Sequence, residues 1–389
     1  INKSNIMGIF RGPNIVTDNL VFGYDTGYGI ADNTTATRFY PGEPSDNLLY
    51  KTGASNLATG GDIYVNSTKT SLGNGKYKWV NDGTGGTTIR IYCNLSDLTN
   101  GESYAISLFY EGLVGSVSLD WCDTSITGYS NTNGKITGIG TRATYTSTYR
   151  FLDINLSTGG SVVLYNPQIE RKSHTTPFVD GIRSDTASLI DLKRTTSIDV
   201  SNVSFDSTGQ PTFDGTSDRI VATPSSAITF SDQLTFDVWI YPMDYTASGG
   251  NRQYLIDPRG DGNTSGMSAY FLFDYMSSPD TVRITAGNSN IEVLSSNFSM
   301  PLNTWHNIVA TRNGNSWVIY HNGISISTGT TNTTSLTLNN AFRIGTYANG
   351  SSGQYFFEGK MAVAKMYNQG LSATQVLQNY NAYKNRFNI

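Results

Sequence analysis

Short stretches in which hydrophobic and polar residues alternate recur through the middle of the chain. They are separated by Gly, Asn, Ser and Thr turns at the spacing expected of a β-sandwich. The stretches are 76–82 (KYKWVND), 87–95 (TTIRIYCNL), 103–112 (SYAISLFYEG), 115–123 (GSVSLDWCD), 149–156 (YRFLDINL) and 161–170 (SVVLYNPQIE). Alternation with period two is typical of strands buried on one face only. This part of the chain is therefore predicted to fold as an antiparallel sandwich.

The pattern restarts near Ser188 and continues almost to the C-terminus. Its clearest strands are 234–243 (LTFDVWIYPM), 269–276 (AYFLFDYM) and 360–368 (KMAVAKMYN). One helix is predicted at the end, where Ser372 and Gln375 form a capping-box pattern. Hydrophobic side chains follow it at helical spacing, namely Val376, Tyr380, Tyr383 and Phe387. The fold class predicted is all-β, with two antiparallel jelly-roll sandwiches and one short C-terminal helix.

Turn-rich segments divide the chain into three parts. Residues 1–46 form an N-terminal arm with one strand candidate, 47–181 form the first sandwich, and 182–389 form the second. The boundary between the sandwiches falls in TTPFVDGIRSD. The arm is too short to bury a core by itself.

The composition agrees with this organisation. Charged residues make up 14 % of the 389 residues, against about 25 % in an average soluble protein. The net charge is only −4, and no cluster of Lys and Arg is present. Neither nucleic acid nor an anionic membrane surface is therefore an expected partner. No apolar run is long enough to span a bilayer, and the first residues lack the apolar core of a secretory signal.

The two cysteines and three histidines give no reactive cluster. Cys93 and Cys122 could be two buried free thiols. Alternatively, they could form a disulfide between neighbouring strands if the compartment is oxidising. His306 and His321 lie in TWHNIVATRNGNSWVIYHNG, in which two Asn-Gly pairs between alternating runs predict a hairpin. Residues 303–323 contain no Asp, Glu or Cys that could orient a catalytic histidine, so a packing role is predicted. His174 is interpreted as a surface residue.

Candidate residues for glycan binding, metal binding and catalysis lie on different segments. Six residues in or beside loops could bind a glycan, because tyrosine rings stack on sugar rings and an amide hydrogen-bonds to hydroxyl groups. They are Tyr245, Tyr254, Tyr275, Tyr347, Asn349 and Tyr355. Asp257 and Asp261, on a Gly-rich turn, could bind Ca²⁺, although a polar hairpin loop is the simpler interpretation. A glycosidase needs two facing carboxylates, and the candidates Asp237, Asp274, Glu292 and Glu358 are scattered. No cofactor is required.

Several stretches carry a resemblance to known families. FDGTSDRIVA, LTFDVWIYP, the histidine hairpin and the segment from FRIGTYANG to the final helix resemble the concanavalin A-like, laminin G-like jelly-roll family in order and spacing. This resemblance implies a calcium site, but Ala362 and Val363 replace the acidic pair of the penultimate strand, which leaves Asp214 and Asp218 as candidate ligands. LYNPQIERKSHTTPFVDG is similar to the exit of carbohydrate-binding-module-like jelly rolls.

The start of the chain, MGIFRGPNIVTDNLVFGYD, resembles virion structural proteins of marine tailed phages, in which a first strand runs directly into such a sandwich. The resemblance implies that residues 14–30 pair with the C-terminal sandwich and that the middle domain is inserted. The alternative is an arm that docks on another subunit, because an exposed apolar strand must pair with some edge.

The predicted function is that of a non-enzymatic protein at the virion surface: a fibre, an appendage or a capsid-decoration subunit. Its domains would bind host glycans or stabilise the particle, and it would associate with itself or with capsid or tail proteins. The alternative is a bacterial extracellular adhesin that binds glycans, and the third hypothesis is a polysaccharide-degrading enzyme.

Overall fold

The computed structural model describes residues 14–27, 42–51, 67–73, 75–83, 88–94, 98–121, 126–132, 134–142, 149–179, 181–245, 252–258, 269–274, 282–286, 291–294, 300–330, 336–338, 341–347 and 355–389. The chain divides into two compact units. Unit 1 comprises 1–28 and 185–389, and unit 2 comprises 29–184. The predicted N-terminal arm, 1–46, is therefore shared between the two units.

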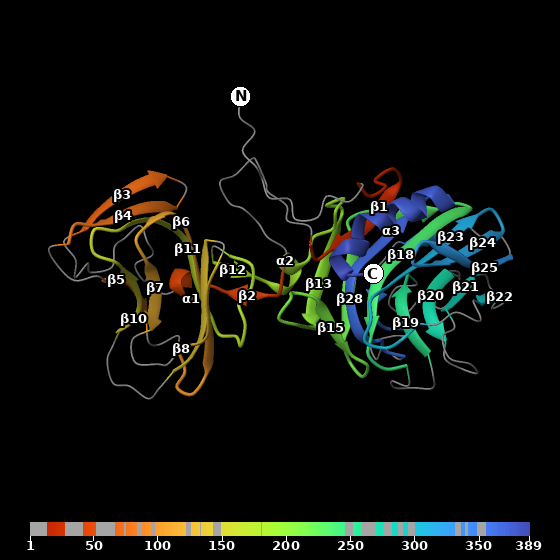
Figure 1. The fold of residues 1–389 in the computed structure, drawn as a ribbon. Coiled ribbons are helices and arrows are strands. Elements are labelled where there is room, and N and C mark those ends of the chain that lie inside the picture. Colours follow the sequence, from red (N-terminus) through yellow and green to blue (C-terminus); the bar gives the residue numbers. More distant parts are fainter. Residues whose placement is uncertain are drawn as a thin grey trace, which may run out of the picture. The chain divides into compact units, whose positions relative to one another are not determined.

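Unit 2 is an antiparallel β-sandwich (Figure 1). Its larger sheet has the spatial order β3 (Ser67–Gly73), β4 (Lys76–Asn81), β11 (Ser161–Glu170), β6 (Ser103–Val114), β9 (Lys135–Thr141), β8 (Ile126–Thr132). Its smaller sheet has the order β5 (Thr88–Asn94), β10 (Tyr149–Leu156), β7 (Val117–Trp121). The core contains Trp79, Leu108, Ile154 and Leu164, and the one-turn helix α1 (Leu48–Lys51) contributes Leu48 and Leu49.

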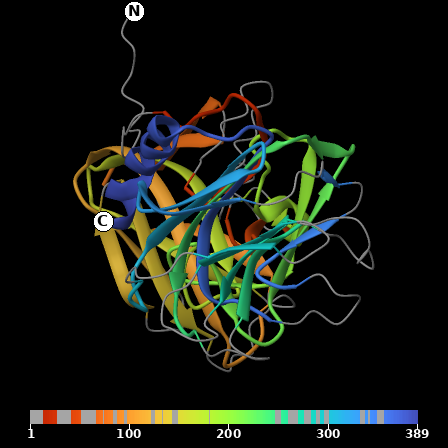
Figure 2. The ribbon, with the colours of Figure 1, turned by 90° about the vertical axis from the view of Figure 1, so that its right-hand side faces the viewer.

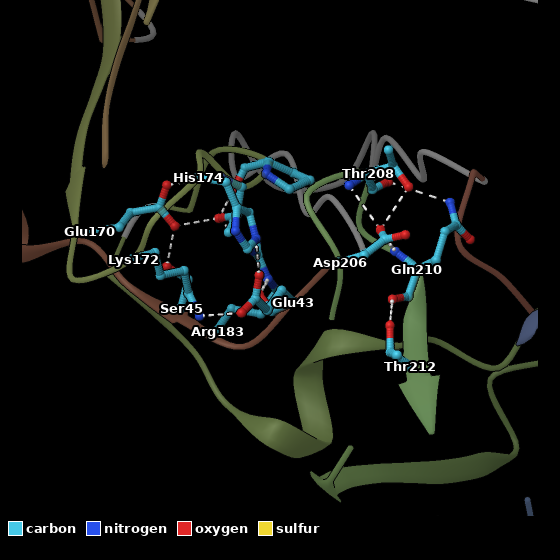
Figure 3. Close-up of polar contacts among 12 residues, drawn as sticks. Glu43, Ser45, Glu170, Lys172, His174, Arg183, Asp206, Thr208, Gln210 and Thr212 are labelled. Carbon is cyan, nitrogen blue, oxygen red and sulfur yellow. Dashed lines mark hydrogen bonds and ion pairs between the residues drawn. The ribbon is translucent and has the colours of Figure 1, made fainter. Parts of the chain in front are cut away.

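A short clasp closes unit 2 where the chain enters and leaves it. β2 (Ser45–Asp46) pairs with β12 (Ile182–Arg183), and the carboxylate of Glu170 contacts Ser45 of this pair (Figure 3). Glu170 is 1 % exposed and accepts hydrogen bonds from the hydroxyl groups of Ser45 and Thr176, both at 2.5 Å. The segment that resembles the exit of carbohydrate-binding modules therefore holds the two ends of this unit together.

Unit 1 is a second, larger antiparallel sandwich. One sheet has the order β14 (Ser204–Phe205), β15 (Pro211–Asp214), β28 (Glu358–Tyr367), β18 (Gln233–Pro242), β23 (His306–Asn313), β24 (Ser316–His321), β25 (Ile324–Thr330). The facing sheet has the order β13 (Thr196–Asn202), β16 (Arg219–Pro224), β27 (Phe342–Ile344), β19 (Arg252–Asp257), β20 (Ala269–Asp274), β21 (Val282–Ala286), β22 (Ile291–Leu294). A two-stranded sheet joins β17 (Ile228–Phe230) to β26 (Leu336–Leu338), and α2 (Asp185–Ser188) precedes β13. The core between the sheets includes Phe236, Ile256, Trp317 and Phe342.

The first strand of the chain completes the first of these sheets. β1 (Leu20–Asp25) pairs antiparallel with residues 363–367 of β28, and β15 pairs with residues 358–360 of the same strand. Phe22 and Tyr24 of β1 are fully buried in the core of unit 1. The strand that precedes the sequence of unit 2 thus belongs to the sheet of unit 1.

The C-terminal helix α3 (Ala373–Phe387) covers the outer face of this sheet (Figures 1 and 2). Ser372 and Gln375 form the predicted capping box. Trp239 stacks on Tyr380 with ring centroids 5.8 Å apart and on Phe387 at 4.6 Å. In the described residues no helix is long and apolar enough to cross a membrane. The predicted all-β fold with one short C-terminal helix is confirmed, and α1 and α2 add one turn each.

Candidate functional site

Three of the predicted glycan-binding tyrosines meet at one end of unit 1. Tyr254 lies on β19, Tyr347 follows β27, and Tyr355 precedes β28. The ring centroid of Tyr254 lies 5.0 Å from that of Tyr347 and 5.9 Å from that of Tyr355, and the last two rings are 5.9 Å apart. Tyr254 is 3 % exposed, whereas the other two are half-buried. Tyr254 therefore forms the base of an aromatic cluster whose other two members reach solvent.

Backbone pairing holds the cluster in place. The amide of Tyr254 donates to the carbonyl of Tyr355 at 3.1 Å, and the amide of Phe357 donates to the carbonyl of Gly345 at 2.8 Å. Gly345 has a φ of 85°, and a Cβ atom there would lie 2.4 Å from the ring of Phe213. Only glycine fits this position. Gly345 thus allows the turn that places Tyr347 beside the other two rings.

Tyr355 itself has an unusual backbone conformation. Its φ is 56°, in the left-handed region, where the other non-glycine residues among those described are five asparagines and Arg194. For a residue with a bulky side chain this conformation costs about 1–2 kcal/mol. Strain of this kind persists only where the surrounding structure imposes it, and it gathers at binding and active sites.

Acidic side chains lie beside the tyrosine cluster. Gln253, which is 1 % exposed, accepts from the amide of Glu358 at 3.0 Å and donates to the carbonyl of Asp244 at 2.7 Å. Glu358 is opposite Asp214 across the β15–β28 pair. Burial, together with the negative charges of Asp244 and Asp214, raises the pKa of Glu358. Glu358 and Asp214 therefore lie on paired strands, one of which, β28, begins three residues after Tyr355.

Of the predicted calcium ligands, Asp214 and Asp218 lie in one turn and hydrogen-bond to each other. Asp214 accepts five hydrogen bonds from the amides and hydroxyl groups of residues 216–218. These bonds hold its pKa far below the usual range, against the effect of partial burial. Asp218 accepts from the amide of Asp214 at 3.1 Å. Asp257 is buried opposite Arg343, and Asp261 lies outside the described residues. The part of the chain that the structure describes contains no group of three acidic, His or Cys side chains suited to a metal.

The remaining glycan candidates have separate locations. Tyr245 packs against the core, and its hydroxyl group donates to the carbonyl of Met300. Neither Tyr275 nor Asn349 belongs to the described residues. Gln253 was not predicted from the sequence, because a single glutamine in a strand gives no signal of the two backbone groups it joins.

Two of the carboxylates considered for glycoside hydrolysis, Asp237 and Glu358, are far apart. Asp237 is fully buried under α3, opposite Lys365 on β28, and their side chains form an ion pair of 2.9 Å. Glu358 begins the same strand, seven residues before Lys365. Seven residues of β-strand span about 24 Å, whereas hydrolytic carboxylate pairs are separated by about 5–9.5 Å. Asp237 and Glu358 cannot act as such a pair.

The two histidines of the hairpin contact each other. β23 and β24 pair as predicted, with the first turn at Gly314 and Asn315, one residue later than the Asn-Gly pair suggested. Nδ1 of His306 lies 2.9 Å from Nε2 of His321, and Nε2 of His306 lies 2.9 Å from the carbonyl of Pro301. Because a carbonyl only accepts, neutral His306 carries its proton on Nε2, and His321 donates to Nδ1. Burial and the neighbouring His306 lower the pKa of His321 to about 4.

Comparison with known families agrees with this fold. Residues 214–377 match the laminin G-type family described as the concanavalin A-like lectin/glucanases superfamily. The matched residues lie within unit 1, whose antiparallel sandwich is therefore similar to concanavalin A-like, laminin G-like jelly-roll domains. A search of curated proteins finds no significant match to the sequence.

Solved structures that parts of this chain resemble come from several classes of protein. Domain 4 of AbnA, a GH43 extracellular arabinanase from Geobacillus stearothermophilus in complex with arabinotriose, is 13 % identical over 51 % of this chain and 93 % of that chain, with a TM-score of 0.35. The sialidase CBM40 of Ruminococcus gnavus bound to α2,3 sialyllactose is 12 % identical over 38 % of this chain and 82 % of that chain, with a TM-score of 0.32. The receptor-binding domain of botulinum neurotoxin type G is 17 % identical over 50 % and 48 % of the two chains, with a TM-score of 0.36. At these identities and TM-scores the likeness says nothing about ligands.

Proposed function

We propose that the protein is a non-enzymatic glycan-binding protein and that the cluster of Tyr254, Tyr347 and Tyr355 is its binding site in unit 1. The observation that carries this proposal is the convergence of three tyrosines from separate strands, one of them in a strained backbone conformation. The jelly-roll domain around the cluster supports it, because this superfamily includes lectins.

The chemistry of the site suits a saccharide. Half-buried tyrosine rings offer apolar surface to the C–H groups of a sugar, and their hydroxyl groups can donate to or accept from its hydroxyl groups. The carboxylate of Glu358, opposite Asp214 on the neighbouring strand, supplies further acceptors. A few directional polar groups beside an aromatic surface are what a specific sugar site requires.

Binding is tested with a glycan array followed by calorimetry on the best ligand. Tyr347→Ala removes a solvent-reaching ring of the cluster and should weaken binding at least ten-fold. Tyr129→Ala is the matched control, because it removes an exposed tyrosine (44 %) from unit 2. Full affinity in the Tyr347→Ala protein, or an equal loss in the Tyr129→Ala control, would count against this site.

The place of the protein is proposed to be the surface of a tailed-phage virion, as a fibre, appendage or capsid-decoration subunit. The resemblance of residues 7–25 to virion structural proteins supports this location. Immunogold electron microscopy of purified particles tests it, and particles that carry no label would exclude a virion location while leaving the glycan site untouched.

Two other functions have distinct signatures. An extracellular adhesin of a bacterium would carry an export signal or a cell-wall anchor in its complete gene. A polysaccharide-degrading enzyme would release reducing ends from host polysaccharide and would lose this activity in Glu358→Gln. The separation of Asp237 from Glu358 is an argument against the enzyme.

A further inference from the structure

Unit 2 carries a row of aromatic and basic side chains on the outer face of its larger sheet. Phe109 on β6 lies opposite Tyr165 on β11 and opposite Lys135 on β9. The two rings stack with centroids 5.6 Å apart and planes at 26°. Nζ of Lys135 lies 5.1 Å from the centroid of Phe109, and Nζ of Lys76, on β4, lies 4.5 Å from that of Tyr165. Four neighbouring strands thus contribute one side chain each.

The row faces away from the core of unit 2. Its members alternate along their strands with Leu108 and Leu164, which are fully buried in that core. Phe109, Tyr165, Lys76 and Lys135 are all half-buried. The row is therefore a surface feature, accessible from the side opposite the sandwich interior.

The orientation of the rings decides which ligand the row suits. Each ring stacks on the other ring and has the ammonium group of a lysine over it, so the ring faces already have partners. Ring edges carry partial positive charge, whereas sugars without charge stack on ring faces. The ring edges and the ammonium groups therefore both favour an anionic ligand.

The ammonium group of Lys135 is available to a ligand. Burial lowers the pKa of Lys135, and the negative charge of Glu170 partly offsets this effect. Both oxygens of Glu170 already accept hydrogen bonds from Ser45 and Thr176. Within the described part of the chain, no carboxylate forms an ion pair with Lys135. A partly dehydrated cation of this kind gains free energy from an anionic acceptor.

The charges around the row also favour an anionic ligand. Lys76, Lys78 and Lys135 face outward with Glu111 as the acidic neighbour, which pairs with Lys76 at 2.7 Å. Three lysines and one glutamate give +2 in a protein whose net charge is −4. Lys76 and Lys135 are three strand spacings apart, about 14 Å, which is too far for one small anion to touch both.

We infer that this row, Lys76, Phe109, Tyr165 and Lys135, is a second binding site, in unit 2, for an acidic polysaccharide whose anionic groups repeat along the chain. It is independent of the tyrosine cluster of unit 1. Both carboxylated and sulfated polysaccharides have the required chemistry.

Calorimetry with the full chain at low ionic strength tests the inference. The probes are a galacturonate octamer, a sulfated heparin octamer, an uncharged dextran octamer and poly-L-glutamate with the same charge as the galacturonate. At least one acidic octamer should bind with an affinity that falls steeply with salt. Lys135→Gln should weaken this binding at least ten-fold, Phe109→Leu several-fold, and Lys135→Arg should retain it.

Lys193→Gln, which removes an exposed lysine from unit 1, is the matched control and should bind like the parent. An unchanged thermal midpoint shows that each variant is folded. The inference is overturned if neither acidic octamer binds, if dextran or poly-L-glutamate binds as tightly, or if Lys193→Gln weakens binding as much as Lys135→Gln. Loss of binding in Tyr347→Ala would assign the acidic glycan to unit 1 instead.

Discussion

Tyr355 has both a strained backbone conformation and a ring in the proposed glycan site. Its φ of 56° is one that asparagine adopts more readily than tyrosine. We expect Tyr355→Asn to raise the free energy of unfolding of unit 1 by up to about 1 kcal/mol and to weaken glycan binding at least ten-fold. Urea unfolding and calorimetry measure the two effects. A variant that is less stable and binds normally would show that the ring is there for packing.

His321 makes the stability of unit 1 depend on pH. Its folded-state pKa of about 4 lies below the ordinary value of 6.5, so the unfolded chain binds a proton first as the pH falls. The neutral histidine pair therefore contributes fully to the free energy of unfolding above pH 6.5. As the pH falls from 6.5 to 4 this contribution is lost, by at most about 1.4 kcal/mol per pH unit. This limit is reduced by the partial exposure of His321 to solvent.

His321→Gln keeps a donor for Nδ1 of His306 but cannot take up a proton. We expect urea unfolding of the parent to show a steeper loss of stability between pH 6.5 and 4.5 than this variant shows. Identical slopes would mean that other groups cause the pH dependence.

Between elements, a buried polar network attaches the start of the chain to α3 and the sheet. Asn379 of α3 accepts from the amide of Val16 at 2.8 Å and donates to Asp237 and to the hydroxyl group of Tyr367, both at 3.0 Å. Tyr367 in turn donates to the carbonyl of Val16 at 3.0 Å. Every member of this network is buried, and burying such groups is favourable only when they are paired.

We expect Asn379→Ala to destabilise unit 1 by about 3 kcal/mol, because it leaves several buried partners unsatisfied. The amides of β1 should then exchange with solvent faster than those of β23. Gln378→Ala is the control, since this half-buried side chain donates to the carbonyl of Asn14 and its loss should cost less than about 1 kcal/mol. Equal effects of the two substitutions would show that the network contributes little.

At the scale of the whole molecule, β1 makes unit 1 discontinuous in sequence. Its loss would leave one edge of residues 363–367 unpaired, since β18 pairs with the other edge, and would empty the core positions of Phe22 and Tyr24. In a protein that lacks residues 1–28, we expect the calorimetric unfolding transition of unit 1 to disappear or to occur at a much lower temperature. The transition of unit 2 should be unchanged, because its core shares no residue with that of unit 1. A normal transition for unit 1 would contradict this role of β1.

Prediction from the sequence succeeded where the pattern was local. The strands β4, β6, β10 and β11 alternate clearly, and the capping box of α3 is a short-range signal. β3, β8 and β9 were not predicted, because STKTSLG, ITGYSNT and KITGIGT carry Gly, Ser and Thr where strong alternation needs large apolar residues. Their pairing is supplied by the neighbouring strands.

The sequence by itself determined the all-β class, the histidine hairpin and the final helix, because each depends on periodicity or on residues close in the chain. The tertiary structure alone decided which loop tyrosines meet, since Tyr254 is separated from Tyr355 by a hundred residues. It also decided that Phe109 and Lys135 share one face and that Asp237 is buried in an ion pair. Such neighbours are set by strand order, which depends on how the whole core is buried and which no local pattern records.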